Sequence, residues 1–254
     1  LWKDKEGGFD IERNKKRVAI YQEAMKKASA ILVTTFELKK YAEQYNKVIA
    51  VIPNSIDPKF VPKLDIKKGK EVNVVWAGGA SHLSDLSEVN PTILEVLNKY
   101  PHVNYCHVGQ RFGYESKFPQ SQFKRWGWVS ADAHGYRLAT VNGDIGICPL
   151  EDNIFNRQKS SIKFYEYSAV GMATLARNMP PYSDDIIDGQ NGLLYNNNEE
   201  FKQKLELLIN DPLYRLQLAN NAYNYVLKKR NLNEIAKDWV SFLQGISDEY
   251  KKHS

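Results

Sequence analysis

The fold is decided by the segment "GDIGICPL" (143–150), with "QKSSIKFYEYSA" (158–169) and "MATLARN" (172–178) after it. The first and third runs are short, apolar and bounded by turn residues, as buried strands are. Between them, residues 161–170 have the apolar spacing of an amphipathic helix. We therefore expect a strand, a helix and a second strand, the unit from which parallel sheets are built.

The same alternation of apolar runs and helical spacing continues on both sides of this segment. The expected strands are 71–80, 103–109, 123–130, 143–150 and 172–178, and the expected helices are 87–100, 132–141, 161–170, 199–209, 211–229 and 231–249. This order predicts an α/β fold, a Rossmann-like parallel sheet with helices on both faces and a helical C-terminal tail. In such sheets ligands bind at the carboxyl ends of the strands. Three loops follow strands in this way: Gly78–Ser84, Gly109–Gly113 and Glu151–Ser161.

Charge and cysteine content narrow the classes of function. The net charge of +5 in 254 residues is spread along the chain, so we expect no nucleic-acid partner. The C-terminal lysines indicate solvated helix faces first and a weak peripheral attraction to anionic lipid or nucleotide second. The two cysteines lie in apolar runs, which indicates buried free thiols and a reducing, cytoplasmic location. Apolar runs of about 20 residues, the length that spans a bilayer, are absent from the sequence.

Two lysines and a glutamate lie at helical spacing around the start of the helix expected at 161–170. Lys159, Lys163 and Glu166 would share one helix face, and Ser160 and Ser161 stand at the expected N-cap. The free amides and the dipole of a helix N-terminus attract phosphate, and two cations there favour a bound anion. Glu166 could accept hydrogen bonds from a sugar or ribose diol. The alternative is an exposed, lysine-rich helix with an internal Lys163–Glu166 pair, and spacing alone does not separate the two.

The glycine loop after the strand expected at 71–80 is a second candidate phosphate site. Gly78 and Gly79 would let the backbone approach a phosphate, and Ser81 and His82 follow them. The loop has neither the G-x-G-x-x-G nor the P-loop pattern, and an ordinary turn with a surface histidine is the alternative. Without G-x-G-x-x-G near the start of the chain, a Rossmann-type epimerase is disfavoured.

Two further loops carry side chains suited to a nucleotide. Trp126 and Trp128 in "RWGWVS" could wall a base pocket, although burial is the stronger expectation for at least one of them. Arg111, after a strand end, suits either a phosphate or base contact or a solvated loop position.

Several motifs together resemble the retaining GT-B glycosyltransferases of the glycosyltransferase group 1, family 4-like class. They are "VIPNSIDPKFVP" (51–62), "GGASHLSDL" (78–86), "WGWVS" (126–130), "FNRQKSSIKFYEYSAVGMATLA" (155–176) and "IIDGQNGLLY" (186–195). The resemblance covers nearly the whole chain in the same order.

The resemblance implies a role for individual residues. Glu166 matches the second glutamate of the E-x7-E signature and would bind the donor ribose; Gln158 replaces the first, which contacts the donor sugar. Lys159 and Lys163 would bind the diphosphate with the amides near Gly79, Ala80, Ser160 and Ser161. The loop at Trp128 and Val129 would meet the base. Lys163 and Glu166 are thus the expected catalytic residues.

The resemblance also implies a domain organisation and a reaction. Residues 1–57 would be the end of a partial N-terminal acceptor lobe, 58–230 the nucleotide-sugar-binding lobe, and 231–254 a helix crossing back to the N-terminal segment. The donor would be a UDP- or GDP-sugar and the acceptor a saccharide or other hydroxyl, with retention of configuration, in polysaccharide or glycoconjugate biosynthesis. No metal or cofactor is expected, since the lysines can supply the positive charge. The alternative function is a catalytically inactive nucleotide-binding or assembly module, which Gln158 and the short N-terminal part favour.

Overall fold

The computed structural model describes residues 11–60, 70–79 and 82–252. The chain forms two compact units, one comprising Leu1–Pro53 and Ala236–Ser254 and the other Asn54–Ile235. We call them unit 1 and unit 2 and describe each by itself.

Unit 1 is built on a pair of short parallel strands. Its elements are α1 (Ile11–Lys27), β1 (Ile31–Val33), α2 (Phe36–Ala42), β2 (Ile49–Val51) and the part of α10 (Leu232–Lys252) from Ala236 onward. Ile31 lies opposite Ile49 in the parallel pair. Helix α2 begins where the Thr35 hydroxyl accepts a hydrogen bond from the Leu38 amide, which satisfies a free donor of the first turn.

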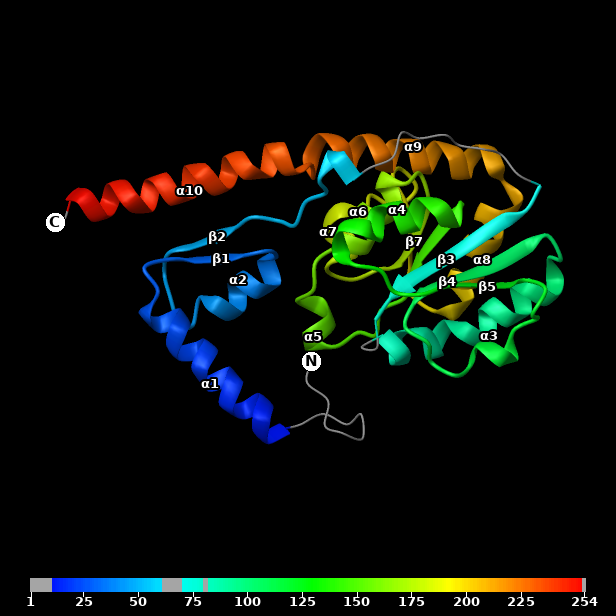
Figure 1. The fold of residues 1–254 in the computed structure, drawn as a ribbon, viewed down its shortest axis with the longest axis horizontal. Helices are drawn as coiled ribbons and strands as arrows, with labels where there is room; N and C mark the ends of the chain where they lie inside the picture. The colour runs from blue at the N-terminus through cyan, green and yellow to red at the C-terminus, as the bar shows by residue number, and fades with distance from the viewer. Residues whose placement is uncertain (1–10, 61–69, 80–81, 253–254) are drawn as a thin grey trace. The chain divides into compact units, whose positions relative to one another are not determined.

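Unit 2 contains a six-stranded sheet in which every pairing is parallel (Figure 1). Its strands are β3 (Val72–Gly78), β4 (Val103–Gly109), β5 (Phe123–Trp126), β6 (Ile145–Cys148), β7 (Ala173–Arg177) and β8 (Leu193–Tyr195). They are ordered β5-β4-β3-β6-β7-β8 across the sheet. The predicted Rossmann-like α/β fold with a helical C-terminal end is confirmed.

Helices lie before, between and after these strands. They are η1 (Pro58–Phe60), α3 (Leu83–Lys99), η3 (Glu115–Lys117), α4 (Ala131–Val141), α5 (Ile154–Arg157), α6 (Ile162–Ala169), α7 (Tyr182–Asp185), α8 (Asn198–Asn210) and α9 (Pro212–Lys229). Helix α3 begins four residues before its expected start, because Pro91 lies inside the helix and not near its first turn. Strand β8 was not predicted, since its three residues are too few to show a period.

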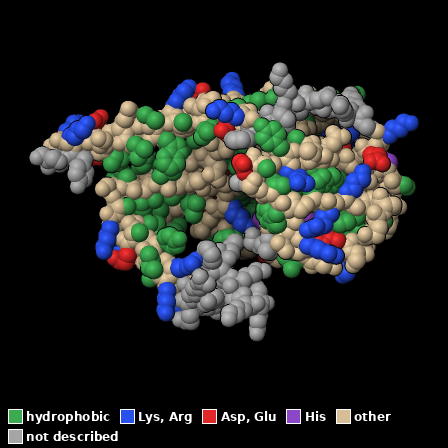
Figure 2. Space-filling model, viewed as in Figure 1, with side chains coloured by type: hydrophobic (Ala, Val, Ile, Leu, Met, Phe, Trp, Pro, Cys, Tyr) green, Lys and Arg blue, Asp and Glu red, His purple; other side chains and the backbone are tan. Residues whose placement is uncertain are grey.

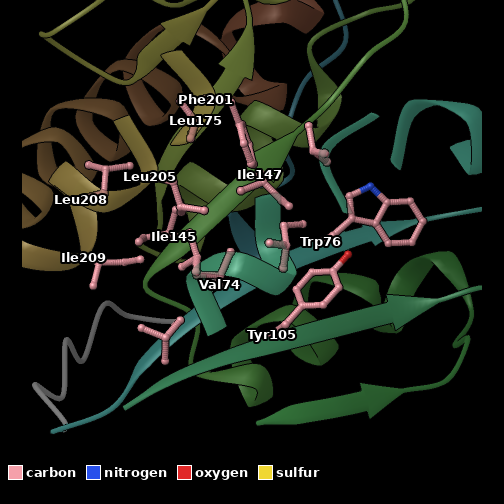
Figure 3. Close-up of a cluster of buried hydrophobic side chains, with 14 of the residues drawn as sticks. Val74, Trp76, Tyr105, Ile145, Ile147, Leu175, Phe201, Leu205, Leu208 and Ile209 are labelled. Atoms are coloured by element: carbon pink, nitrogen blue, oxygen red, sulfur yellow. The ribbon is translucent and has the colours of Figure 1, made fainter. Parts of the chain in front are cut away.

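The central strands bury side chains on both faces of the sheet. Val74 and Trp76 of β3 point into one core, formed with α3 and α8, while Val75 and Ala77 point into a second, formed with α4, α6 and α9. This follows from the two-residue period of a strand. Figure 1 shows these helices on the two sides of the sheet, and Figure 3 shows the first core, where Phe201 and its neighbours on α8 face the strands.

On the face in view, lysine and arginine side chains are interspersed with acidic ones (Figure 2). Several form surface ion pairs across helices, as Lys99 does with Glu206 at 2.9 Å and Lys202 with Glu95 at 2.7 Å. Such exposed pairs contribute little stability, about 0–1 kcal/mol each. In the part of the chain that the structure describes, no helix is both long enough and apolar enough to cross a bilayer.

Candidate functional site

The order of the strands marks the place where a ligand can bind. Chain connections run outward in opposite directions from β3 and β6, so the helices that follow these two strands diverge. At this switch point a crevice opens beyond the carboxyl ends of the strands. A cleft of about 420 Å³ lies there. It is lined by Ala77, Gly78, His82, Val108, Gly109, Gly127, Trp128, Val129, His134, Lys159, Ser160, Ile162, Lys163, Glu166 and Tyr182.

Lys163, in the first turn of α6, places a buried ammonium in this cleft. Only 9% of the residue is exposed. Its Nζ lies 2.9 Å from Nε2 of His82 and 5.5 Å from the centre of the Trp76 ring. A Cβ added to Gly78 would lie 3.1 Å from that Nζ. A side chain at position 78 would therefore crowd the ammonium, and glycine keeps this space open.

The electrostatic surroundings of Lys163 favour loss of its proton. Burial lowers its pKa to about 8, and the charge of Lys159 acts in the same direction, whereas Cys148, Glu166 and Asp85 oppose it. Among the described residues, no carboxylate lies within the 4.0 Å of Lys163 that an ion pair requires. A buried cation without a counter-ion is costly, and a bound anion would compensate it.

Lys159 adds a second cation to the cleft. Its Nζ is buried and has no hydrogen-bond partner among the described residues, and it lies 5.0 Å from the centre of the Phe155 ring. Burial lowers the pKa of Lys159. Lys159 precedes α6, which begins at Ile162, so the expectation that it shares a helix face with Lys163 is wrong. We call Lys159, Lys163 and the first turn of α6 the anion seat.

Behind Lys163, His82 is held by a buried carboxylate. His82 is the N-cap of α3, and its Nδ1 lies 2.6 Å from Oδ2 of Asp85, a residue with no exposed surface. Burial lowers the pKa of His82 to about 4, so its ring is neutral at neutral pH. Burial would raise the pKa of Asp85, but hydrogen bonds from His82 and from the Glu151 amide outweigh it and lower this pKa.

Glu166 lies one turn deeper in α6 and faces a histidine of α4. Its Oε2 is 3.5 Å from Nε2 of His134, and hydrogen bonding to Glu166 raises the pKa of His134. The described residues contain no Lys163–Glu166 ion pair, and Lys163 is buried. The alternative interpretation, an exposed helix with an internal ion pair, is therefore wrong. Glu166 is half-buried, so its carboxylate can reach a polar ligand in the cleft.

The first turn of α6 lacks a side-chain cap. Ser161 is its N-cap, but the Ser161 hydroxyl donates to the carbonyl of Pro181 at 2.8 Å and does not cap the helix. The neighbouring Ser160 hydroxyl accepts a hydrogen bond from Nδ2 of Asn54 at 2.7 Å. The amides at the start of α6 are therefore available to an anion in the cleft.

Most of the sequence-predicted site residues meet in this cleft, although their roles stay predictions. Gly78, His82, Trp128, Val129, Lys159, Ser160, Lys163 and Glu166 line it. Gly79 lies under the exposed Trp128, whose Cζ2 would be 3.3 Å from an added Cβ. Trp126, by contrast, packs against the second core.

Gly79 and three other predicted residues do not line the cleft. Ser161 is buried behind it, Gln158 ends α5, and Arg111 is an exposed loop residue. Ser81, together with Ala80, lies outside the described residues.

Sequence reasoning missed Asp85 and His134. The spacing of His82 and Asp85, three residues apart at the start of a helix, is a signal that could have identified the first. Nothing in the sequence around His134 indicates its approach to Glu166, because that contact depends on how α4 packs against α6.

Comparison with known proteins bears on this site. Residues 157–225, which include the anion seat, match the family "Glycosyl transferases group 1". Solved structures match with a TM-score of 0.71 for Anabaena HepE in complex with UDP and glucose, and 0.69 for a mutant of S. aureus TarM in complex with Fondaparinux, alpha-GlcNAc-glycerol and UDP. The chain has the fold of the corresponding part of these two structures.

The matches are distant in sequence. HepE and TarM are each 16% identical to this chain. The match with HepE covers 90% of this chain and 66% of HepE, and the match with TarM covers 94% of this chain and 48% of TarM. A C-terminal domain of a glycosyl transferase group 1 family protein, LpcC, from Francisella tularensis matches over 70% of this chain and 99% of its own, with 18% identity and a TM-score of 0.53. No curated protein matches. Over the described residues, no group of three or more His, Cys, Asp and Glu side chains could hold a metal ion.

Proposed function

We propose that the cleft of unit 2 binds a nucleoside diphosphate sugar, with UDP or GDP as the nucleotide, and that the protein transfers the sugar to a hydroxyl acceptor. The observation that carries this proposal is the buried Lys163 ammonium, which has no carboxylate partner among the described residues and borders a cleft at the switch point of the sheet. The match of residues 157–225 and the UDP named with HepE and TarM support the choice of ligand class.

The anion seat would act mainly on the leaving group. When the bond between the sugar and the diphosphate breaks, negative charge develops on the departing phosphate oxygen. Lys163, Lys159 and the amides at the start of α6 would meet that charge, and preorganised donors of this kind supply a large share of catalysis in many enzymes. Glu166 would bind the ribose hydroxyls. We further propose retention of configuration and a saccharide or other hydroxyl as acceptor, as expected from the resemblance.

A second candidate function is nucleotide binding without turnover. Gln158 stands where the resemblance places a glutamate that contacts the donor sugar. Gln158 does not line the cleft. Incubation with UDP- and GDP-sugars, with and without saccharide acceptors, separates the two. Release of UDP or GDP supports the transferase, while binding without release supports the inactive module.

Nucleotide binding is expected to depend on pH through Lys163. The lowered pKa, about 8, belongs to the ligand-free protein, and a bound diphosphate would raise it by favouring the charged form. Binding above pH 8 must therefore take up a proton, and UDP affinity should fall as pH rises, approaching tenfold per unit. The terminal phosphate of UDP, with a pKa of about 6, is already ionised there and does not contribute.

Calorimetry in buffers of different ionisation enthalpy at pH 8.5 measures this uptake. Lys159→Met keeps Lys163 and should keep the fall in affinity, which assigns the titration, but the fall should begin at a higher pH because the charge of Lys159 lowers the pKa of Lys163. Affinity that stays constant from pH 7 to 10 would contradict the assignment of Lys163 to the diphosphate.

A further inference from the structure

Asp85 does not line the cleft, yet hydrogen bonds connect it to Lys163. Its Oδ2 faces Nδ1 of His82 at 2.6 Å, and Nε2 of the same ring faces the Lys163 ammonium at 2.9 Å. An ionised carboxylate can only accept, so Nδ1 must carry the ring proton. An ammonium can only donate, so Nε2 must be the acceptor. The two contacts require the same tautomer of His82.

The other oxygen of Asp85 is committed to the loop before α6. Oδ1 accepts from the Glu151 amide at 2.8 Å and from Nδ2 of Asn156 at 3.2 Å. Asp85 thus joins the start of α3 to the segment that leads into the anion seat. Both of its oxygens are occupied, which fixes the orientation of the carboxylate.

We propose that Asp85 is a positioning residue for the anion seat, which fixes the Nδ1–H tautomer of His82 and so keeps the Nε2 lone pair on Lys163 and the ammonium in the cleft. The proposal rests on the proposed function for its ligand, a nucleoside diphosphate. His82 then acts as the acceptor that holds Lys163, and one of the three N–H groups of the ammonium is used inside the protein.

Several charged or titratable groups affect the pKa of Lys163, and the proposal concerns Asp85 among them. Lys159 acts from the loop before α6, Glu166 from α6 itself and Cys148 from the end of β6, while Asp85 acts from α3. His82 makes the direct contact. His134 of α4 is paired with Glu166.

Asp85→Asn tests the tautomer because the structure dictates how the amide must turn. The position of Oδ1 receives two donors, so the amide oxygen stays there and the NH₂ group faces His82. Nδ1 must then accept, the ring proton moves to Nε2, and an N–H group meets the ammonium of Lys163. Only a neutral Lys163 amine can accept that N–H, so the variant favours deprotonation of Lys163.

The first measurement is the affinity for UDP as a function of pH, by calorimetry. In Asp85→Asn we expect affinity at pH 7.5 to fall about tenfold and the pH at which it declines to shift down by about one unit, since a charge-assisted hydrogen bond is lost. A loss of rigidity alone would lower affinity without moving that pH. An unchanged affinity and an unchanged midpoint, in a wild-type protein that binds UDP, would overturn the proposal.

The matched control is Asp144→Asn. Asp144 is also a partly buried carboxylate that accepts from a backbone amide, that of Asn73 at 2.8 Å, but it lies at the opposite, amino-terminal end of β6. We expect its UDP affinity and pH midpoint to match those of the wild type. A shift as large as that of Asp85→Asn would attribute the effect to general destabilisation and overturn the proposal.

The second measurement needs no nucleotide. Long-range proton–nitrogen NMR of ¹⁵N-histidine protein distinguishes the two tautomers, and His82→Gln assigns the His82 signals. We expect Nδ1–H in the wild type and Nε2–H in Asp85→Asn. Nε2–H in the wild type overturns the proposal even if Asp85→Asn does not fold. The expected tautomers in a protein that binds neither UDP nor GDP would support the positioning of Lys163 and overturn the proposed function.

Discussion

Lys163→Met should abolish high-affinity UDP binding and at the same time stabilise the fold. We expect the affinity for UDP at pH 7.5 to fall about 100-fold, because a buried charged donor that lines the cleft is lost. The free energy of unfolding at pH 7 should rise by about 2 kcal/mol, since the native state no longer holds a buried ammonium without a counter-ion. Calorimetry and chemical denaturation measure the two effects.

The pH dependence of the free energy of unfolding tests whether the buried Lys163 ammonium destabilises the fold. The pKa of Lys163 is about 8 in the folded protein, against the ordinary lysine value of 10.5. Between these values the unfolded chain binds more protons, so the contribution of Lys163 to stability rises with pH across that window. Lys163→Met should lack this rise. Lys202→Met, which removes an exposed lysine paired with Glu95, should change neither UDP binding nor this slope. A destabilised Lys163→Met protein that still binds UDP would refute both the burial argument and the site.

Gly109→Ala should destabilise unit 2 by about 3 kcal/mol, combining left-handed backbone strain with overpacking. Gly109 ends β4 with φ of +111°, and an added Cβ would lie 2.4 Å from the carbonyl oxygen of Gly78. Because the contacted atom belongs to the backbone, relief requires a shift of the backbone at the ends of β3 and β4. Because Gly78 borders Lys163, UDP affinity should fall as well. Thermal or chemical unfolding measures the first effect and calorimetry the second.

Gly113→Ala is the control that separates strain from collision. Gly113 also has a positive φ, +86°, but no other atom of the described residues lies within 4 Å of its added Cβ. We expect about 1 kcal/mol of destabilisation from the backbone alone, and unchanged UDP affinity. Equal losses in the two variants would show that contact with Gly78 plays no part.

The sequence predicts the fold well, because the strands of unit 2 are apolar on both faces and separated by clear helices. The runs at 72–78, 103–109 and 145–148 needed no tertiary information. The short elements α5, α7 and β8 escaped prediction, since three or four residues show no period and depend on packing for their stability.

The candidate site was only partly predictable for a related reason. Lys163 and Glu166 could be placed together because they are local neighbours on one helix. The pairing of His82 with Lys163 depends instead on β3 lying next to β6, which is a property of strand order. Asp85 and His134 were missed because their positions in helices give no sign of their partners. Their roles depend on the residues that pack against them, His82 for Asp85 and Glu166 for His134.

The contact between His82 and Lys163 joins residues 81 positions apart in the chain. Loop closure over such a distance is slow and comes after local structure has formed. In a partly folded chain with only β3 and β4 paired, His82 therefore does not yet hold the Lys163 ammonium, and the nucleotide site is incomplete. Nucleotide occupancy consequently reports the completed pairing of β3 with β6, and a bound diphosphate should slow unfolding without accelerating the early steps of folding.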